Sequence, residues 1–85
     1  MHYVYVLQNS HGENYIGQTK DLQRRLTEHN SRANMSTRFS SEWKLVYYEA
    51  YASAEDAFRR EKRLKDDGRA RYQLMSRISA SKAVI

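Results

Sequence analysis

A hairpin signature near the amino terminus constrains the fold of this chain more than any other feature. Residues 3–7 (YVYVL) are all β-branched, aromatic or aliphatic, a composition that suits a pleated, half-buried strand. Residues 9–14 supply turn chemistry, and residues 14–18 indicate a short return strand. Because an isolated hairpin is only marginally stable in water, the rest of the chain must cover it with a further layer.

The chain is short and basic. It has 85 residues, no cysteine and a formal net charge of +5, and ten of its fifteen cationic side chains are arginine. This length predicts one domain with a modest core, and the lack of cysteine excludes disulfides and thiolate zinc sites. Since arginine binds phosphate in a two-pronged geometry, we expect nucleic acid as the partner. With no apolar run near the ~20 residues of a membrane span and no secretory leader, we expect a cytoplasmic protein without a membrane partner.

The segment after the hairpin, residues 19–30, predicts a helix with Thr19 as its N-cap. Leu22 shares one face of this helix with Leu26 and His29. Arg25 lies about 60° from Leu22, on the margin of that face, whereas Arg24 points nearly opposite. Of the two arginines, Arg25 is therefore expected to face the sheet.

The remaining chain predicts a strand over 44–51, a helix over 53–66, a terminal helix over 69–78 and a frayed tail over 79–85. Ser53 begins a capping-box pattern, and Gly68 is the expected stop of the helix that follows it. The inward stripe of that helix is expected to hold Ala54, Ala57, Phe58 and Leu64. Glu61 falls in the middle of this stripe, where a carboxylate is costly unless it is paired, hydrogen-bonded or bound to a cation.

Four segments of the chain resemble the motifs of the GIY-YIG nuclease superfamily, in the same order along the sequence. Residues 15–17 (YIG) match the second half of the name motif, and residues 3–5 (YVY) occupy the first half. Residues 18–30 resemble the second family motif, and residues 59–65 (RREKRLK) resemble the helix that carries the family's glutamate. The similarity is strongest to small single-domain bacterial members related to the excinuclease nuclease module.

The resemblance implies an α+β fold, a three-stranded antiparallel sheet flanked by helices in the order β-β-α-β-α-α, over a domain of residues 1–78. It implies a metal-dependent endonuclease that hydrolyses DNA phosphodiester bonds in DNA repair or processing, with Mg²⁺ or Mn²⁺ as cofactor. The implied substrate is DNA, including branched or damaged DNA, and a partner protein could supply targeting. The sequence does not predict the oligomeric state.

By position, the catalytic residues of the family fall on Tyr5, Tyr15, Arg25, His29 and Glu61. Glu61 would hold the metal ion, Arg25 would contact the phosphate, and Tyr15 would position or deprotonate the attacking water. Tyr5 or His29 would then relay the proton. The side chains expected to contact nucleic acid are Arg24, Arg32, Arg38, Arg59, Arg60 and Lys65.

Each of these residues also has a structural alternative. The hairpin tyrosines could pack across the strands, and the sequence does not fix whether the tyrosines of the two strands share a face. Arg25 could pair with Asp21, and Glu61 with Lys65, each one helical turn away and worth only a few tenths of a kcal/mol when exposed. His29 could simply satisfy helix-terminal carbonyls, and the basic row 59–65 could be a solvated face.

The sequence is also compatible with two other functions. A nucleic-acid-binding module of the same fold would show little or no cleavage and steep salt dependence, and Mg²⁺ would affect it only by screening. A protein-interaction or structural domain would show no affinity for DNA at moderate salt.

Overall fold

The computed structural model describes residues 1–31 and 42–84. Its elements are β1 (His2–Gln8), β2 (Asn14–Thr19), α1 (Leu22–Asn30), β3 (Lys44–Tyr51), α2 (Ala54–Asp66), α3 (Gly68–Arg77) and α4 (Ser79–Val84). The strands form one antiparallel sheet in the order β2-β1-β3, so β2 and β3 are its two edges. The predicted α+β class and three-stranded sheet are confirmed.

The hairpin turn is held by the buried side chain of Asn9. Its Oδ1 accepts hydrogen bonds from the backbone N–H groups of His11 (3.0 Å) and Glu13 (2.9 Å). Gly12 adopts a φ of 79°, a left-handed conformation that glycine reaches without steric cost. This local chemistry joins β1 to β2 and sets the register on which the site depends.

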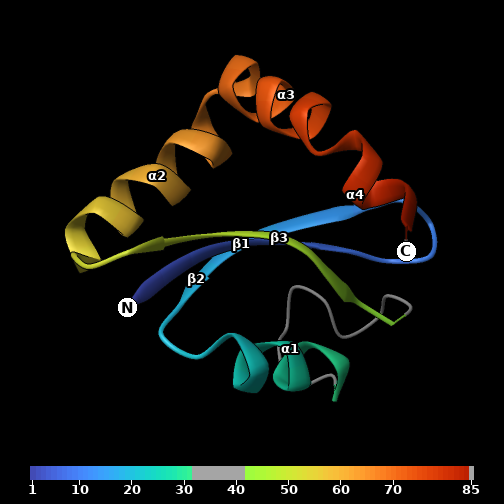
Figure 1. Ribbon diagram of the computed structural model, residues 1–85, viewed down its shortest axis with the longest axis horizontal. Helices are drawn as coiled ribbons and strands as arrows, with labels where there is room; N and C mark the ends of the chain where they lie inside the picture. Colours follow the sequence, from blue (N-terminus) through green and yellow to red (C-terminus); the bar gives the residue numbers. More distant parts are fainter. Residues whose placement is uncertain (32–41, 85) are drawn as a thin grey trace.

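The two faces of the sheet carry different layers (Figure 1). Helix α1 lies on one face, and α2, α3 and α4 lie on the other. Because side chains alternate along a strand, β1 contributes to both cores. The α2 side is built from Val4, Val6, Ile16, Ala57, Leu64, Leu74 and Ile78, and the α1 side from Tyr5, Leu7 and Trp43 with Leu22 and Leu26 against them.

Helix α1 begins later than the sequence predicts. Asp21 is its N-cap, and the Asp21 carboxylate accepts a hydrogen bond from the backbone N–H of Arg24 at 3.1 Å. Thr19, the predicted cap, is still paired with Tyr3 across the sheet. The prediction was wrong because the strand extends one residue beyond the predicted 14–18 and includes Thr19, so the cap moves two residues on to Asp21.

Helix α2 begins at its predicted cap, since the Ser53 hydroxyl accepts from the backbone N–H of Glu55 at 3.2 Å. Phe58, which the pattern predicts to face inward, is 57% exposed. The buried face is centred on Ala57 and Leu64, and Phe58 lies about 100° from Ala57 around the axis. Glu61 lies only about 40° from Ala57, so it faces the sheet as expected.

The prediction that Gly68 ends the helix was wrong, because Gly68 is the first residue of α3. Asp67 is both the C-cap of α2 and the N-cap of α3. Residues 79–84, for which the sequence predicts a frayed tail, form α4, and the Gln8 side chain donates to the carbonyl of Lys82 at 2.9 Å. Within the described residues, no helix is long and apolar enough to cross a membrane.

Candidate active site

The register of the hairpin brings two tyrosines to one face. Tyr5 pairs with Gly17, and Tyr15 lies two residues from Gly17 on the same strand. Tyr5 and Tyr15 therefore share the α1 face, with ring centroids 6.3 Å apart. A Cβ at residue 17 would lie 2.6 Å from Cζ of Tyr5, so the glycine makes room for the phenol. The sequence left this register open, and the structure answers it.

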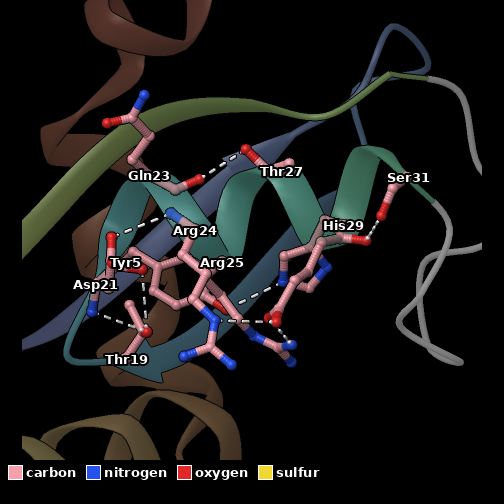
Figure 2. A network of polar contacts seen from close by, with 10 residues as sticks. Tyr5, Thr19, Asp21, Gln23, Arg24, Arg25, Thr27, His29 and Ser31 are labelled. Atoms are coloured by element: carbon pink, nitrogen blue, oxygen red, sulfur yellow. Dashed lines mark hydrogen bonds and ion pairs between the residues drawn. The ribbon is translucent and has the colours of Figure 1, made fainter.

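Tyr5 is the centre of a polar network from α1, shown in Figure 2. Its hydroxyl lies 3.0 Å from Nε2 of His29 and accepts a hydrogen bond from Nε of Arg25 at 3.3 Å. Arg25 and His29 are one turn apart on α1, so both reach the same phenol. Nη1 of Arg25 donates to Glu28 at 3.0 Å. We call Tyr5, Arg25, Glu28 and His29 the Tyr5 network.

Burial keeps Tyr5 and His29 uncharged in this network. Burial raises the pKa of Tyr5 to about 12, although the Arg25 hydrogen bond and charge oppose the shift. Burial, and next the charge of Arg25, lower the pKa of His29 to about 4. At neutral pH both groups are uncharged. The Tyr5 hydroxyl donates to Nε2 when the His29 proton is on Nδ1, and it accepts from Nε2 in the other tautomer. In either tautomer Tyr5 links Arg25 to His29.

The two arginines of α1 separate as the helical pattern predicts. The Arg25 side chain is 28% exposed and contacts Tyr5, whereas that of Arg24 is 76% exposed and pairs with Glu28 at 3.4 Å. Arg25 pairs with Glu28 rather than with Asp21, the partner considered from the sequence. An inward arginine whose acidic partner lies on the helix surface remains available to a phosphate.

Lys65 of α2 links Glu61 to Tyr15 of the edge strand β2. The Tyr15 ring packs edge-on against His29, with centroids 4.6 Å apart. The Glu61 side chain, only 19% exposed, pairs with Lys65 at 3.0 Å, the ion pair considered from the sequence. Nζ of Lys65 in turn lies 5.8 Å from the centroid of the Tyr15 ring. Although α1 and α2 lie on opposite faces, each places one side chain near the Tyr15 ring, His29 from α1 and Lys65 from α2.

Comparison with known protein families identifies this arrangement. The family model described as the GIY-YIG catalytic domain matches residues 1–73, which is most of the chain. This chain belongs to the GIY-YIG family. The resemblance seen in the sequence is confirmed.

Relatives of this GIY-YIG chain come from archaea and bacteria. It is 40% identical to the UPF0213 protein of Halobacterium salinarum, over 88% of this chain and 99% of that protein. It is 41% identical to the UPF0213 protein of Streptococcus agalactiae serotype V, over 79% of this chain and 77% of that protein. The solution NMR structure of a UPF0213 protein from Bacillus halodurans has 38% identity and a TM-score of 0.57, covering 88% of this chain and 82% of that one.

The donor set suits a metal ion shared with the substrate. Among the described residues, no group of three or more His, Cys, Asp or Glu side chains could hold a metal by itself. Glu61 is one largely buried carboxylate with a cation beside it. Mg²⁺ is commonly held by one or two carboxylates together with substrate phosphates, so these residues fit an ion that binds with the phosphate.

The six residues predicted to contact nucleic acid have different surroundings. Arg24 and Arg59 are exposed on their helices, Arg59 with its guanidinium on Glu55 and Asp56. Lys65 forms an ion pair with Glu61 within the candidate site. Arg60 is directed instead at Glu49 of β3, with Nε 2.9 Å from Oε1. Arg32 and Arg38 lie outside the described residues.

Sequence reasoning missed one residue that positions the network. The Asn30 amide donates to the carbonyl of Trp43 at 2.9 Å and accepts from its N–H at 2.7 Å. This two-way bond ties the end of α1, next to His29, to the start of β3. An asparagine at a helix end is common, so nothing in the sequence marks this partner thirteen residues away.

Proposed function

We propose that this GIY-YIG chain is a metal-dependent endonuclease that hydrolyses DNA phosphodiester bonds. The observation that carries the proposal is the network that joins Tyr5 to Arg25 and His29, with the Tyr15 ring against His29. Glu61 is linked to Tyr15 through Lys65. Membership of a family whose model is described as a catalytic domain supports the same reaction class.

In this mechanism Arg25 binds the scissile phosphate. Its guanidinium already donates Nε to Tyr5 and Nη1 to the surface carboxylate of Glu28. A phosphate oxygen competes with Glu28 for Nη1, and the bond strengthens as negative charge builds on the pentavalent phosphorus. Loss of one such donor typically costs about 10²–10³ in rate.

Tyr15 positions the attacking water, and the Tyr5–His29 pair receives its proton. In the His29 tautomer protonated at Nδ1, the Tyr5 oxygen would take a proton as it passes its own to Nε2. Ordinary phenols with a pKa near 10 are too protonated to act alone as a base at neutral pH, which is why a second acceptor matters. The low pKa of His29 then favours prompt return of the proton.

Glu61 supplies the carboxylate for Mg²⁺ or Mn²⁺, which when bound would neutralise phosphate charge and stabilise the leaving oxygen. Lys65 neutralises Glu61 in the free protein. With Glu61 engaged by the metal ion, the Lys65 ammonium beside Tyr15 would be available to contact the DNA backbone.

The proposal extends to a biological setting. The net charge of +5 and the exposed Arg24 and Arg59 support binding along the DNA backbone. We propose branched or damaged DNA as substrate, a cytoplasmic role in repair or processing, and a partner protein that supplies targeting.

A cleavage assay tests the function. Purified protein would be incubated with supercoiled and branched DNA in Mg²⁺, Mn²⁺ or EDTA, beside Glu61→Ala, Tyr15→Phe and Arg25→Ala, each checked for folding by circular dichroism. We expect metal-dependent nicking that all three variants lose. Nicking that survives Glu61→Ala would reject the proposed site.

A second function is supported by the pairing of Glu61 with Lys65 and by the lack of a preformed metal cluster among the described residues. Both features suit a nucleic-acid-binding module without cleavage. That module predicts salt-sensitive binding, an affinity that Mg²⁺ changes only by screening, and no nicking on any substrate.

A further inference from the structure

A second polar network lies on the opposite face of the sheet, around Glu49 of β3. Arg60 of α2 approaches this carboxylate from Nε at 2.9 Å and from Nη2 at 2.9 Å, one nitrogen toward each oxygen. Tyr47 donates to Oε2 at 2.7 Å, and Tyr51 donates to Oε1 at 2.5 Å. We call Glu49, Arg60, Tyr47 and Tyr51 the Glu49 network.

This network is closed. The Glu49 side chain is 15% exposed and that of Arg60 is 28% exposed, and both carboxylate oxygens carry an arginine and a phenol donor. Although burial raises the pKa of Glu49, the bonds from Arg60, Tyr51 and Tyr47 outweigh it and lower that pKa. A planar, two-pronged arginine–carboxylate pair fixes direction as well as distance.

The sequence neighbour of Arg60 is Glu61. Consecutive residues of a helix point about 100° apart, so α2 directs Arg60 to Glu49 of β3 and Glu61 to Lys65, which lies near the Tyr15 ring. The Arg60 pair therefore helps to fix the rotation of α2 about its own axis. Because side chains of a helix reach about 5–6 Å from its axis, a rotation of about 20° would move the Glu61 carboxylate by about 2 Å. A misplacement of about 1 Å can already cost 10²-fold in rate.

We propose that the Glu49 network is a positioning device that sets the rotation of α2 and so places Glu61 for the metal ion and the substrate. The inference rests on the proposed nuclease function. Glu49 and Arg60 touch neither substrate nor metal ion and act through Glu61.

The test separates positioning from folding stability. Replacement of a buried ion pair by well-packed apolar residues is often neutral or stabilising, whereas removal of one partner is destabilising. We would compare Arg60→Met, the double variant Glu49→Met with Arg60→Met, and the control Arg63→Met, whose guanidinium is exposed and pairs with Asp67 at 3.4 Å. The first two readouts are the Mg²⁺ concentration for half-maximal cleavage and the DNA affinity in EDTA. The third is an NMR titration that gives the Mn²⁺ concentration at which the Glu61 amide resonance has lost half of its intensity by broadening.

For the double variant we expect a Tm close to that of the wild type and unchanged DNA affinity. The Mg²⁺ and Mn²⁺ concentrations that it requires should rise about tenfold to a hundredfold. Losses of this size are typical when the outer partners of a metal ligand are removed. Arg63→Met should change none of these. A folded double variant with wild-type metal requirements would overturn the proposal. If the wild type does not cleave DNA, the proposed function fails, and the Mn²⁺ broadening of Glu61 still decides the positioning role.

Discussion

The two polar networks use the same residue types on opposite faces of one sheet, and they differ in which group is buried. The Tyr5 network buries a neutral phenol and a neutral imidazole and leaves its acid, Glu28, 34% exposed on a helix surface. The Glu49 network buries its acid and satisfies both carboxylate oxygens. In the first network a phosphate can compete with the exposed Glu28 for Arg25. In the second, Arg60 and both Glu49 oxygens are already bonded to each other and to the two phenols.

This difference shows how residues of similar type divide between chemistry and architecture. Arg25 and Arg60 have the same side-chain exposure, 28%, and each donates from a helix to a side chain of the sheet. What separates them is how strongly an acidic partner holds the guanidinium. A buried carboxylate in a two-pronged pair is a permanent partner, and an exposed one is exchangeable.

The largest effect should come from breaking the Glu49 network at its acid. Glu49→Ala leaves the half-buried Arg60 without its carboxylate, and we expect a loss of about 3 kcal/mol in the free energy of unfolding. Urea denaturation at neutral pH measures this loss. A change below about 1 kcal/mol would show that the network is a surface ion pair rather than a closed structural device.

An intermediate effect is expected at Gly17. Gly17→Ala places a Cβ against the Tyr5 phenol, which must leave its position beside Arg25 and His29. Overpacking of this kind costs about 1–3 kcal/mol, and cleavage should fall with it. The same unfolding assay gives the first quantity. If Gly17→Ala is as stable and active as the wild type, the Tyr5 phenol does not need its observed place.

The two networks should also respond to different pH ranges. The pKa of His29 is lowered from 6.5 to about 4, so the unfolded chain binds more protons between these values. Stability is then lost as the pH falls from about 6.5 toward 4. The lowered pKa of Glu49 means that its contribution is lost as the pH falls below its ordinary 4.5. Unfolding free energies measured from pH 7 to 3 should show the first decline in the wild type and not in His29→Gln.

The smallest effect is expected at Glu28, the exchangeable acid. Glu28→Gln weakens a surface pair, so the Tm should stay near that of the wild type. Because phosphate no longer competes with a carboxylate for Arg25, DNA affinity should rise about twofold to fivefold. Fluorescence anisotropy with a labelled duplex measures this change, and weaker binding would contradict the exchange of Glu28 for phosphate.

Much of the fold follows from the sequence. The β-branched and aromatic runs predict all three strands, and the Ser53 cap predicts the start of α2. Two of the errors concern boundaries that depend on tertiary structure, and a third is the inward position predicted for Phe58. Strand pairing at Thr19 delays α1, and Asp67, rather than Gly68, separates α2 from α3.

The site is harder to predict than the fold. Helical periodicity predicts that Arg25 and Glu61 face inward, which the structure confirms. Neither composition nor spacing predicts the hydrogen bond between Tyr5 and His29, since it depends on how the hairpin and α1 pack together. Arg60 illustrates the same limit, because its partner, Glu49, lies on another element and only the folded chain brings them together.

The central claim, that the β2 edge is a catalytic site with Glu61 as its metal ligand, is tested most directly by one paired measurement. The rate of DNA nicking at saturating Mg²⁺ and the Tm would be measured for the wild type and Glu61→Gln, which keeps the shape of the side chain. We predict that nicking by Glu61→Gln falls to the level seen in EDTA while its Tm stays close to that of the wild type. Wild-type nicking by folded Glu61→Gln would contradict the account.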